Sequence, residues 1–135
     1  MVRNSFAVVL GIVVGMTLNM MLIQLNSHVF FPMPPGTDVN DPAQFNAYIA
    51  GLPHRAFIVV LLAHLGQSFV GAWVAARLGT SHRMKLALSV GVVSLIGGVL
   101  AMGMIDGPDW LVVELPLYLV VAWLAGSLVE DEEPG

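Results

Sequence analysis

The sequence predicts an all-α polytopic membrane protein, in which four transmembrane helices form a bundle and a short helix lies in the outer loop. Composition is the first reason for this prediction. The 135-residue chain is 57% hydrophobic and only 10% charged, whereas a soluble domain has about 25% charged residues. The second reason is that its apolar residues fall into runs close to the roughly 20 residues that cross a bilayer as a helix. By length, we expect one transmembrane domain covering residues 1–135.

Four predicted spans divide the chain, and the remaining residues form one long loop, two short turns and a tail. The spans lie at about 5–25, 56–78, 86–105 and 110–129, with the outer loop at 26–55 and an acidic tail at 130–135. The first apolar run exceeds the h-region of a signal peptide, which has about 7–15 residues, so we expect it to be retained as a span. Pro116 should kink the fourth span. The acidic tail should be disordered.

The outer loop contains the signals of a short helix. Asp41 is a favourable N-cap residue, Pro42 fits the first helical position, and Gln44 sits where a capping box places Glu or Gln. The predicted helix runs from about Pro42 to Ala50. Its apolar side consists of Phe45, Tyr48 and Ile49. We expect this helix to lie in the membrane interface; a loop helix packed on the bundle is the alternative.

Lysine and arginine residues predict the orientation of the chain across the membrane. Cytoplasmic loops of membrane proteins carry an excess of these residues. One side of the predicted bundle holds Arg3, Arg77, Arg83 and Lys85, whereas the other side holds only Arg55. Both termini should therefore be cytoplasmic, and the outer loop should face away from the cytoplasm.

Small residues recur at spacings of three and four along several spans. In a membrane, such stripes let two helix backbones approach closely. The residues predicted to pack helices together are Gly11, Gly15, Gly71, Gly91, Ser94 and Gly98. The first two form a G-x-x-x-G pattern, which also occurs at dimer contacts, although packing inside the bundle is the expected use here.

The span at 56–78 carries polar residues near its middle. His64, Gln67 and Ser68 fall on one face of this span, because residues three and four apart are neighbours on a helix. An ionisable group inside the membrane normally faces the bundle interior and finds a partner there. This span should therefore be surrounded by other helices, and the rest of the chain should be organised around it.

A short internal match indicates which residue could partner His64. The segments at 71–78 and 121–128, GAWVAARL and VAWLAGSL, share an Ala-Trp pair and a final leucine. Extending this alignment places His64 and Glu114 at the same distance before their tryptophans, and hence at one depth in the membrane. Asn19 of the first span is expected in the same half of the bundle. The candidate intramembrane polar site consists of His64, Glu114, Asn19 and Gln67.

These observations leave three interpretations of function. The favoured one is a non-enzymatic accessory or scaffold protein that packs against another membrane protein or a second copy of itself, its polar pair fixing helix register. The alternative is a small proton-coupled transporter or permease, in which His64, a residue that titrates near neutral pH, works with Glu114. The third is an intramembrane enzyme acting on lipid, with His64 as base. Access of water to His64 separates a transporter from a scaffold.

The sequence lacks the residues and motifs that several kinds of catalytic and binding sites require. It has no cysteine, which excludes disulfides and thiolate metal sites. It contains no Walker loop, dinucleotide fingerprint or nucleophile–base pattern, and no basic patch that indicates nucleic acid. His28 and His54 lack the ligand spacing of a zinc site. We therefore expect no cofactor, no metal and no catalytic residue, with the lipid bilayer as the surrounding partner.

Parts of the second span and its approach resemble a known group of proteins. The segments that carry the resemblance are LPHRAF at 52–57, HLG at 64–66 and GAWVAARL at 71–78. In these segments the chain resembles small uncharacterised bacterial four-span inner-membrane proteins. The resemblance implies a bacterial inner membrane as the location, and it implies no activity.

Overall fold

The computed structural model describes residues 2–130, and every regular element in that part of the chain is helical. The elements are α1 (Val2–Leu25), the π-helical segment η1 (Asn26–Phe30), α2 (Pro42–Ala50), α3 (His54–Leu78), α4 (Arg83–Met102), the 3-10 helix η2 (Asp109–Val113) and α5 (Glu114–Glu130). The acidic tail predicted at 130–135 lies outside the described residues, except for Glu130.

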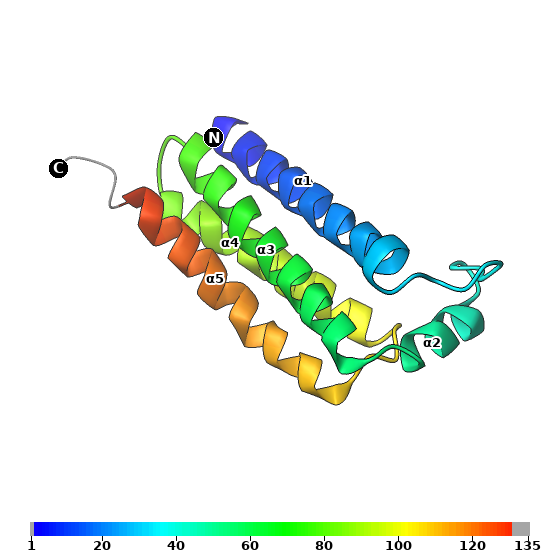
Figure 1. The fold of residues 1–135 in the computed structure, drawn as a ribbon. Helices are drawn as coiled ribbons and strands as arrows, with labels where there is room; N and C mark the ends of the chain where they lie inside the picture. Colours follow the sequence, from blue (N-terminus) through cyan, green and yellow to red (C-terminus); the bar gives the residue numbers. More distant parts are fainter. Residues whose placement is uncertain (1, 131–135) are drawn as a thin grey trace.

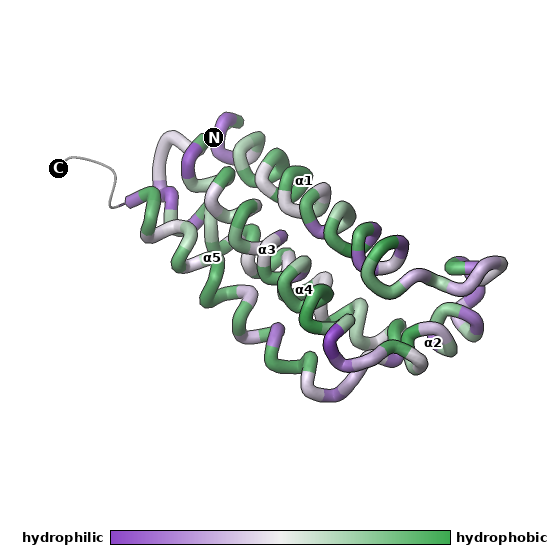
Figure 2. The backbone as a smooth tube through the Cα atoms, in the orientation of Figure 1, coloured by the Kyte–Doolittle hydropathy of each residue, from purple (hydrophilic) through white to green (hydrophobic). Residues whose placement is uncertain are grey.

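Four stretches of helix are long and apolar enough to cross a membrane, and this confirms the predicted fold class. They are Val2–Phe30, His54–Leu78, Arg83–Met102 and Asp109–Glu130. Figure 1 shows them side by side in an elongated bundle, with α2 at one end and with the start of α1 and the finish of α5 at the other. We call these two ends the loop end and the terminal end. Hydrophobic colour runs along the long helices, and hydrophilic colour gathers mainly at the two ends (Figure 2).

Helix α3 is the central helix of the bundle, because it packs against α1, α4 and α5. Its small residues permit this arrangement. The buried residues of α3 include Ala63, Ser68, Gly71, Ala72, Ala75 and Ala76. A helix with so little side-chain volume on several sides can receive three neighbours at short distance. The structure thus agrees with the expectation that other helices surround this segment.

Helices α1 and α3 run antiparallel and meet through glycine residues. A Cβ atom on Gly71 would lie 2.8 Å from the carbonyl oxygen of Gly11. A Cβ atom on Gly15 would collide with the carbonyl oxygen of Gln67. Any larger residue at these positions would force the two backbones apart, so the G-x-x-x-G pattern of α1 faces α3 within the bundle.

The stripe of small residues on α4 faces α5. Gly91, Ser94 and Gly98 are all buried. A Cβ atom on Gly91 would lie 2.7 Å from Ala122 Cβ, and one on Gly98 would lie 2.6 Å from Tyr118 Cε2. Close contact between these two helices therefore depends on glycine at these two positions, because glycine has no Cβ atom.

The buried core lies toward the terminal end and consists mostly of alanine. Its members are Ala72, Ala75, Ala76, Ala87, Val90, Ala122, Ala125 and Val129. Larger apolar side chains point outward instead, and Val13, Met20, Leu62, Ile96 and Leu100 are each more than half exposed. Soluble proteins bury such residues. The reversed arrangement is typical of a helix bundle in lipid, where packing of small residues holds the helices together.

Helix α4 lies earlier in the chain than the predicted span at 86–105. It starts at Arg83 and ends at Met102. The Gly103 N–H donates to the carbonyl oxygens of both Val99 and Leu100, and this tightened last turn ends the helix before the apolar run is complete.

The expected kink in the last span is replaced by a change of helix type. Asp109–Val113 form a 3-10 helix, and the α-helix starts at Glu114. Pro116 therefore lies in the first turn of α5, where an amide hydrogen is not needed for helical hydrogen bonding. Proline marks the start of the α-helix here and does not interrupt it.

Helix α2 has the predicted bounds, Pro42–Ala50. Asp41 caps it by accepting hydrogen bonds from the backbone N–H groups of Ala43 and Gln44. Gln44 Nε2 donates to the Asp41 carboxylate at 3.0 Å, so this pair differs from a capping box, in which the glutamine would bond the N-cap amide. The Gln44 side chain, followed by the two backbone groups, lowers the pKa of Asp41.

Two hydrogen bonds hold α2 across the loop end of the bundle. The Tyr48 hydroxyl donates to the carbonyl oxygen of Phe31 at 3.1 Å, and partial burial raises the pKa of Tyr48. On the other side, Asn46 Oδ1 accepts a bond of 3.1 Å from the Asp106 N–H. Helix α2 thus joins the loop that follows α1 to the turn that follows α4.

Candidate functional site

A chain of hydrogen-bonded side chains joins α3 to α5. His64 Nδ1 lies 2.9 Å from Glu114 Oε2. The other carboxylate oxygen, Oε1, accepts a bond of 3.1 Å from the Tyr118 hydroxyl. Ser68 Oγ donates to the Tyr118 carbonyl oxygen at 3.0 Å. Four polar residues on two parallel helices therefore form one connected cluster, which we call the polar cluster.

Helical spacing explains how the sequence builds the polar cluster. His64 and Ser68 are four residues apart on α3, and Glu114 and Tyr118 are four residues apart on α5. Residues at this spacing share a helix face, so two facing pairs meet across one contact. Glu114 is also the first residue of α5, where the positive end of the helix dipole favours a carboxylate.

Glu114 and His64 differ in exposure. The Glu114 side chain is 3% exposed, whereas the His64 side chain is 24% exposed. The carboxylate is therefore enclosed by protein, and the imidazole is the part of the pair that other molecules can reach.

His64 and Glu114 lie in the wall of a large cavity at the loop end. Its volume is about 1100 Å³, slightly above the usual range of about 300–1,000 Å³ for small-molecule sites. The remaining lining residues come from α1, η1, α2, α3, α4, η2 and the loops between them: Met20, Ile23, Gln24, Asn26, Ser27, His28, Met33, Thr37, Val39, Phe45, Tyr48, Ile49, Leu52, Phe57, Val60, Ala101, Met102, Ile105, Gly107, Pro108, Asp109, Leu111 and Val112. The cavity thus collects residues from nearly every element.

Asn26 adds an unsatisfied acceptor to the wall of this cavity. The residue is 4% exposed, and its Nδ2 donates to the carbonyl oxygen of Ala56 at 3.2 Å. Its Oδ1 is buried and has no hydrogen-bond partner among the described residues. A buried acceptor without a donor is unfavourable, so a bound molecule or water with an N–H or O–H group would stabilise this position.

The other two residues of the predicted site, Asn19 and Gln67, do not join the polar cluster. Within the described part of the chain, neither makes a hydrogen bond to His64 or Glu114, and Asn19 Oδ1 is buried without a partner. Gln67 turns its backbone carbonyl toward Gly15. Both residues lie where α1 packs on α3, whereas the polar cluster lies between α3 and α5.

Sequence reasoning missed Tyr118, although a signal for it was present. Tyr118 follows Glu114 by four residues and is 3% exposed. A buried tyrosine hydroxyl usually has a hydrogen-bond partner, and residues four apart are neighbours on a helix. Together, these rules could have identified the Tyr118–Glu114 bond.

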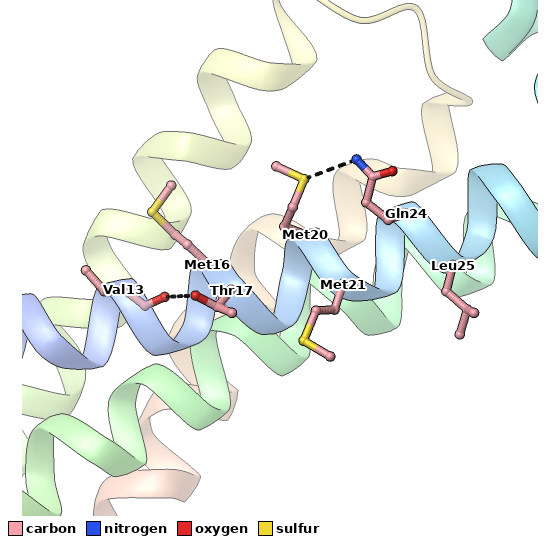
Figure 3. Close-up of a pocket in the computed structure, with 7 residues that line it drawn as sticks. All are labelled: Val13, Met16, Thr17, Met20, Met21, Gln24 and Leu25. Atoms are coloured by element: carbon pink, nitrogen blue, oxygen red, sulfur yellow. Dashed lines mark hydrogen bonds between the residues drawn. The ribbon is translucent and has the colours of Figure 1, made fainter.

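A second hollow, of about 640 Å³, runs along the outside of α1. Figure 3 shows that the lining side chains all come from this helix. They are Val13, Met16, Thr17, Met20, Met21, Gln24 and Leu25. The polar members bond locally: Thr17 Oγ1 donates to the carbonyl oxygen of Val13 at 2.8 Å, and Gln24 Nε2 contacts Met20 Sδ at 3.8 Å. This surface belongs to the apolar outside of the bundle.

Two of the three histidines outside the polar cluster, His28 and His54, have local partners. Trp110 Nε1 donates to His54 Nδ1 at 3.3 Å, and His28 Nδ1 lies 2.9 Å from the carbonyl oxygen of Gln24. Within residues 2–130, no group of three or more His, Cys, Asp or Glu side chains is arranged to hold a metal ion.

Comparison of the chain with protein-family profiles, curated protein sequences and solved structures found no match. The residues of the polar cluster and of the cavity are therefore the features that bear on function.

Proposed function

We propose that this chain is a small membrane protein that acts as a proton-coupled transporter or permease, with the His64–Glu114 pair as its proton site and the cavity at the loop end as its substrate site. One observation carries the proposal. His64 bonds a carboxylate that is enclosed by protein, and the same imidazole lines a cavity large enough for a small organic molecule. A purely structural polar pair has no need of such access.

The geometry of the pair suits reversible protonation. With Glu114 ionised, its two oxygens accept bonds from His64 Nδ1–H and from the Tyr118 hydroxyl. His64 Nε2 is then the nitrogen that can take a proton, and histidine is the side chain that titrates nearest neutral pH. The carboxylate fixes the orientation of the ring. Protonation changes the charge of the pair from −1 to 0, which is how a proton could alter the affinity for a charged substrate.

The proposed setting is a bacterial inner membrane with both termini in the cytoplasm. The excess of Lys and Arg at the terminal end supports this orientation. In this setting the cavity lies in the outer half of the bundle, and we assign it to the outward-facing state of the proposed transporter. Transport further requires a second state that is open at the terminal end, where the alanine core now closes the bundle.

The second candidate function is a scaffold or accessory role toward another membrane protein or a second copy of the chain. The observation that favours it is that the polar cluster ties α3 to α5 with every bond directed inside the protein. A cluster of this kind can fix the register of two helices without having any further function.

Cysteine labelling tests the proposed function without a known substrate. Because the chain has no cysteine, a single introduced thiol is the only reactive one. Val60→Cys places it in the cavity wall beside an intact polar cluster. A membrane-impermeant maleimide added from the outer side should label it, because thiolate forms readily only in contact with water.

The matched control is Ala63→Cys, on the same helix at a fully buried position. It should react only after denaturation. If Val60→Cys is as unreactive as Ala63→Cys, water does not reach the cavity, and the transporter proposal is overturned in favour of the scaffold.

A further inference from the structure

We infer that the ligand of the cavity is an amphipathic organic cation, a molecule with an apolar body and one positive charge. This inference names the substrate class of the site and so rests on the proposed function. It begins with the charges of the wall. The lining includes the carboxylates of Glu114 and Asp109 and contains no lysine or arginine. An anion in the cavity would lie near two carboxylates, and no lysine or arginine of the wall would pair with it.

The ionisable groups around the His64–Glu114 pair come from several elements. Tyr118 of α5 bonds Glu114 directly. The others that line the cavity are Asp109 of η2, His28 of η1 and Tyr48 of α2. The residues that α1 and α4 contribute to the lining are not ionisable: Met20, Ile23, Gln24, Ala101 and Met102. With both histidines neutral, the wall therefore carries only negative charge.

One uncharged polar residue of the wall, Asn26, also favours a cation. Asn26 Oδ1 is a buried acceptor without a partner among the described residues. A carbonyl oxygen presents the negative end of its dipole, so it attracts a nearby positive charge.

The apolar lining suits the body of such a molecule. Phe45 and Phe57 present aromatic rings, whose faces attract cations. Met20, Met33 and Met102 also line the cavity, and methionine adapts to ligands of different shape because its side chain is flexible and polarisable. The wall thus combines negative charge with a deformable apolar surface, which indicates selection by charge and hydrophobicity more than by detailed shape.

Proton and cation should oppose each other at this site. Uptake of a proton by His64 cancels the charge of the pair, and a bound cation disfavours that proton. Binding of the cation should therefore be stronger at a pH where His64 is neutral. Competition between a proton and a cation for one site is what a transporter that exchanges protons for cations requires.

The test compares two ions of the same shape and opposite charge, tetraphenylphosphonium and tetraphenylborate. Binding to the full chain in lipid nanodiscs is measured by equilibrium dialysis at about pH 8 and about pH 5.5, on either side of histidine titration, with empty nanodiscs subtracted. We expect protein-dependent binding of the cation to exceed that of the anion by about tenfold or more, because the carboxylates of the wall attract a nearby cation and repel a nearby anion. The cation should bind more weakly at the lower pH.

Two variants and one control locate the binding. Glu114→Gln and Asp109→Asn should each weaken binding of the phosphonium ion several-fold, because each removes one carboxylate from the cavity wall. Asp109 is exposed, so its variant stays informative if Glu114→Gln fails to fold. Asp106→Asn is the control, because Asp106 is exposed and lies outside the cavity wall, and it should bind as the parent does.

The result that overturns the inference is protein-dependent binding of the borate equal to or stronger than that of the phosphonium ion. The inference is also overturned if neither ion binds to the protein. Lipid acyl chains that fill the cavity would give this result. Labelling of Val60→Cys tests the proposed function without any ligand. If the cysteine is labelled but the cation does not bind, the ligand class is refuted and the proposed function is not. Cation binding without proton-coupled movement in proteoliposomes supports the ligand class and refutes the transporter.

Discussion

The ring of Tyr118 on α5 lies against Gly98 on α4, so close that a Cβ atom on Gly98 would stand 2.6 Å from Tyr118 Cε2. The hydroxyl of the same ring donates to Glu114. The glycine stripe of α4 and the polar cluster between α3 and α5 are therefore coupled through one side chain. Volume added at position 98 would displace the ring that holds the carboxylate.

The first prediction is that Gly98→Leu destabilises the bundle. Overpacking of a tightly packed core typically costs about 1–3 kcal/mol, and here the leucine would also push Tyr118 away from Glu114. A lower melting temperature in detergent is the expected measurement. Gly97→Leu is the matched control, because a Cβ atom there would have no neighbour within 4 Å. Equal melting temperatures for the two variants would show that position 98 faces lipid.

The second prediction concerns orientation across the membrane. Reporter fusions after Gly135 and near Asn40 should report opposite sides, with the first in the cytoplasm, because Lys and Arg concentrate at the terminal end. An alkaline phosphatase and a fluorescent protein fusion at each position give complementary signals. If both positions report the same side, the proposed topology is wrong.

Most of the fold could be predicted from the sequence because membrane helices follow simple rules. Apolar length located the four spans, and N-cap chemistry at Asp41 located α2 with its correct bounds. The end of α4 was missed because the apolar run continues through Ile105, while the turn at Gly103 stops the helix earlier. Hydropathy alone does not detect such a turn.

The candidate site could be predicted only in part. His64 and Glu114 share a register relative to their tryptophans, and the structure places them 2.9 Å apart. Asn19 was assigned by depth alone, and depth does not specify which side of α3 a neighbouring helix occupies. The cavity itself has no local sequence signal, because its wall combines residues from nearly every element of the chain.

The third prediction concerns the pH dependence of α2. The pKa of Asp41 is lowered from its usual value of 3.8 in the folded chain, so its ionised form stabilises the cap. This contribution is fully present above the unfolded pKa and is lost as the pH falls through the lower folded value. Amide NMR signals of Ala43 and Gln44 should therefore shift together below about pH 4.

The control for this titration is Asp41→Asn. Asparagine is also a favourable N-cap residue but does not ionise, so α2 should persist and the acid-dependent shift should vanish. An unchanged acid transition in this variant would assign the titration to another group.

The last prediction separates the two proposed functions at the polar cluster itself. Removing His64 alone would leave the enclosed Glu114 carboxylate with only the Tyr118 hydroxyl as a partner, and a buried polar group that loses a hydrogen bond costs about 1–3 kcal/mol, more when it is charged. Replacing both residues by leucine removes both charges, and apolar replacement of a buried pair is often neutral. Because the Tyr118 hydroxyl would then lack its acceptor, Tyr118→Phe completes the change. The triple variant His64→Leu, Glu114→Leu, Tyr118→Phe should therefore fold with a melting temperature near that of the parent, and His64→Leu alone should melt lower.

The triple variant then separates the two functions. A transporter with this triple change should lose proton-coupled movement of cations in proteoliposomes. A scaffold should keep its interactions, measured by co-purification in mild detergent or by its own oligomeric state. Full transport by a correctly folded triple variant would exclude the polar cluster as the proton site.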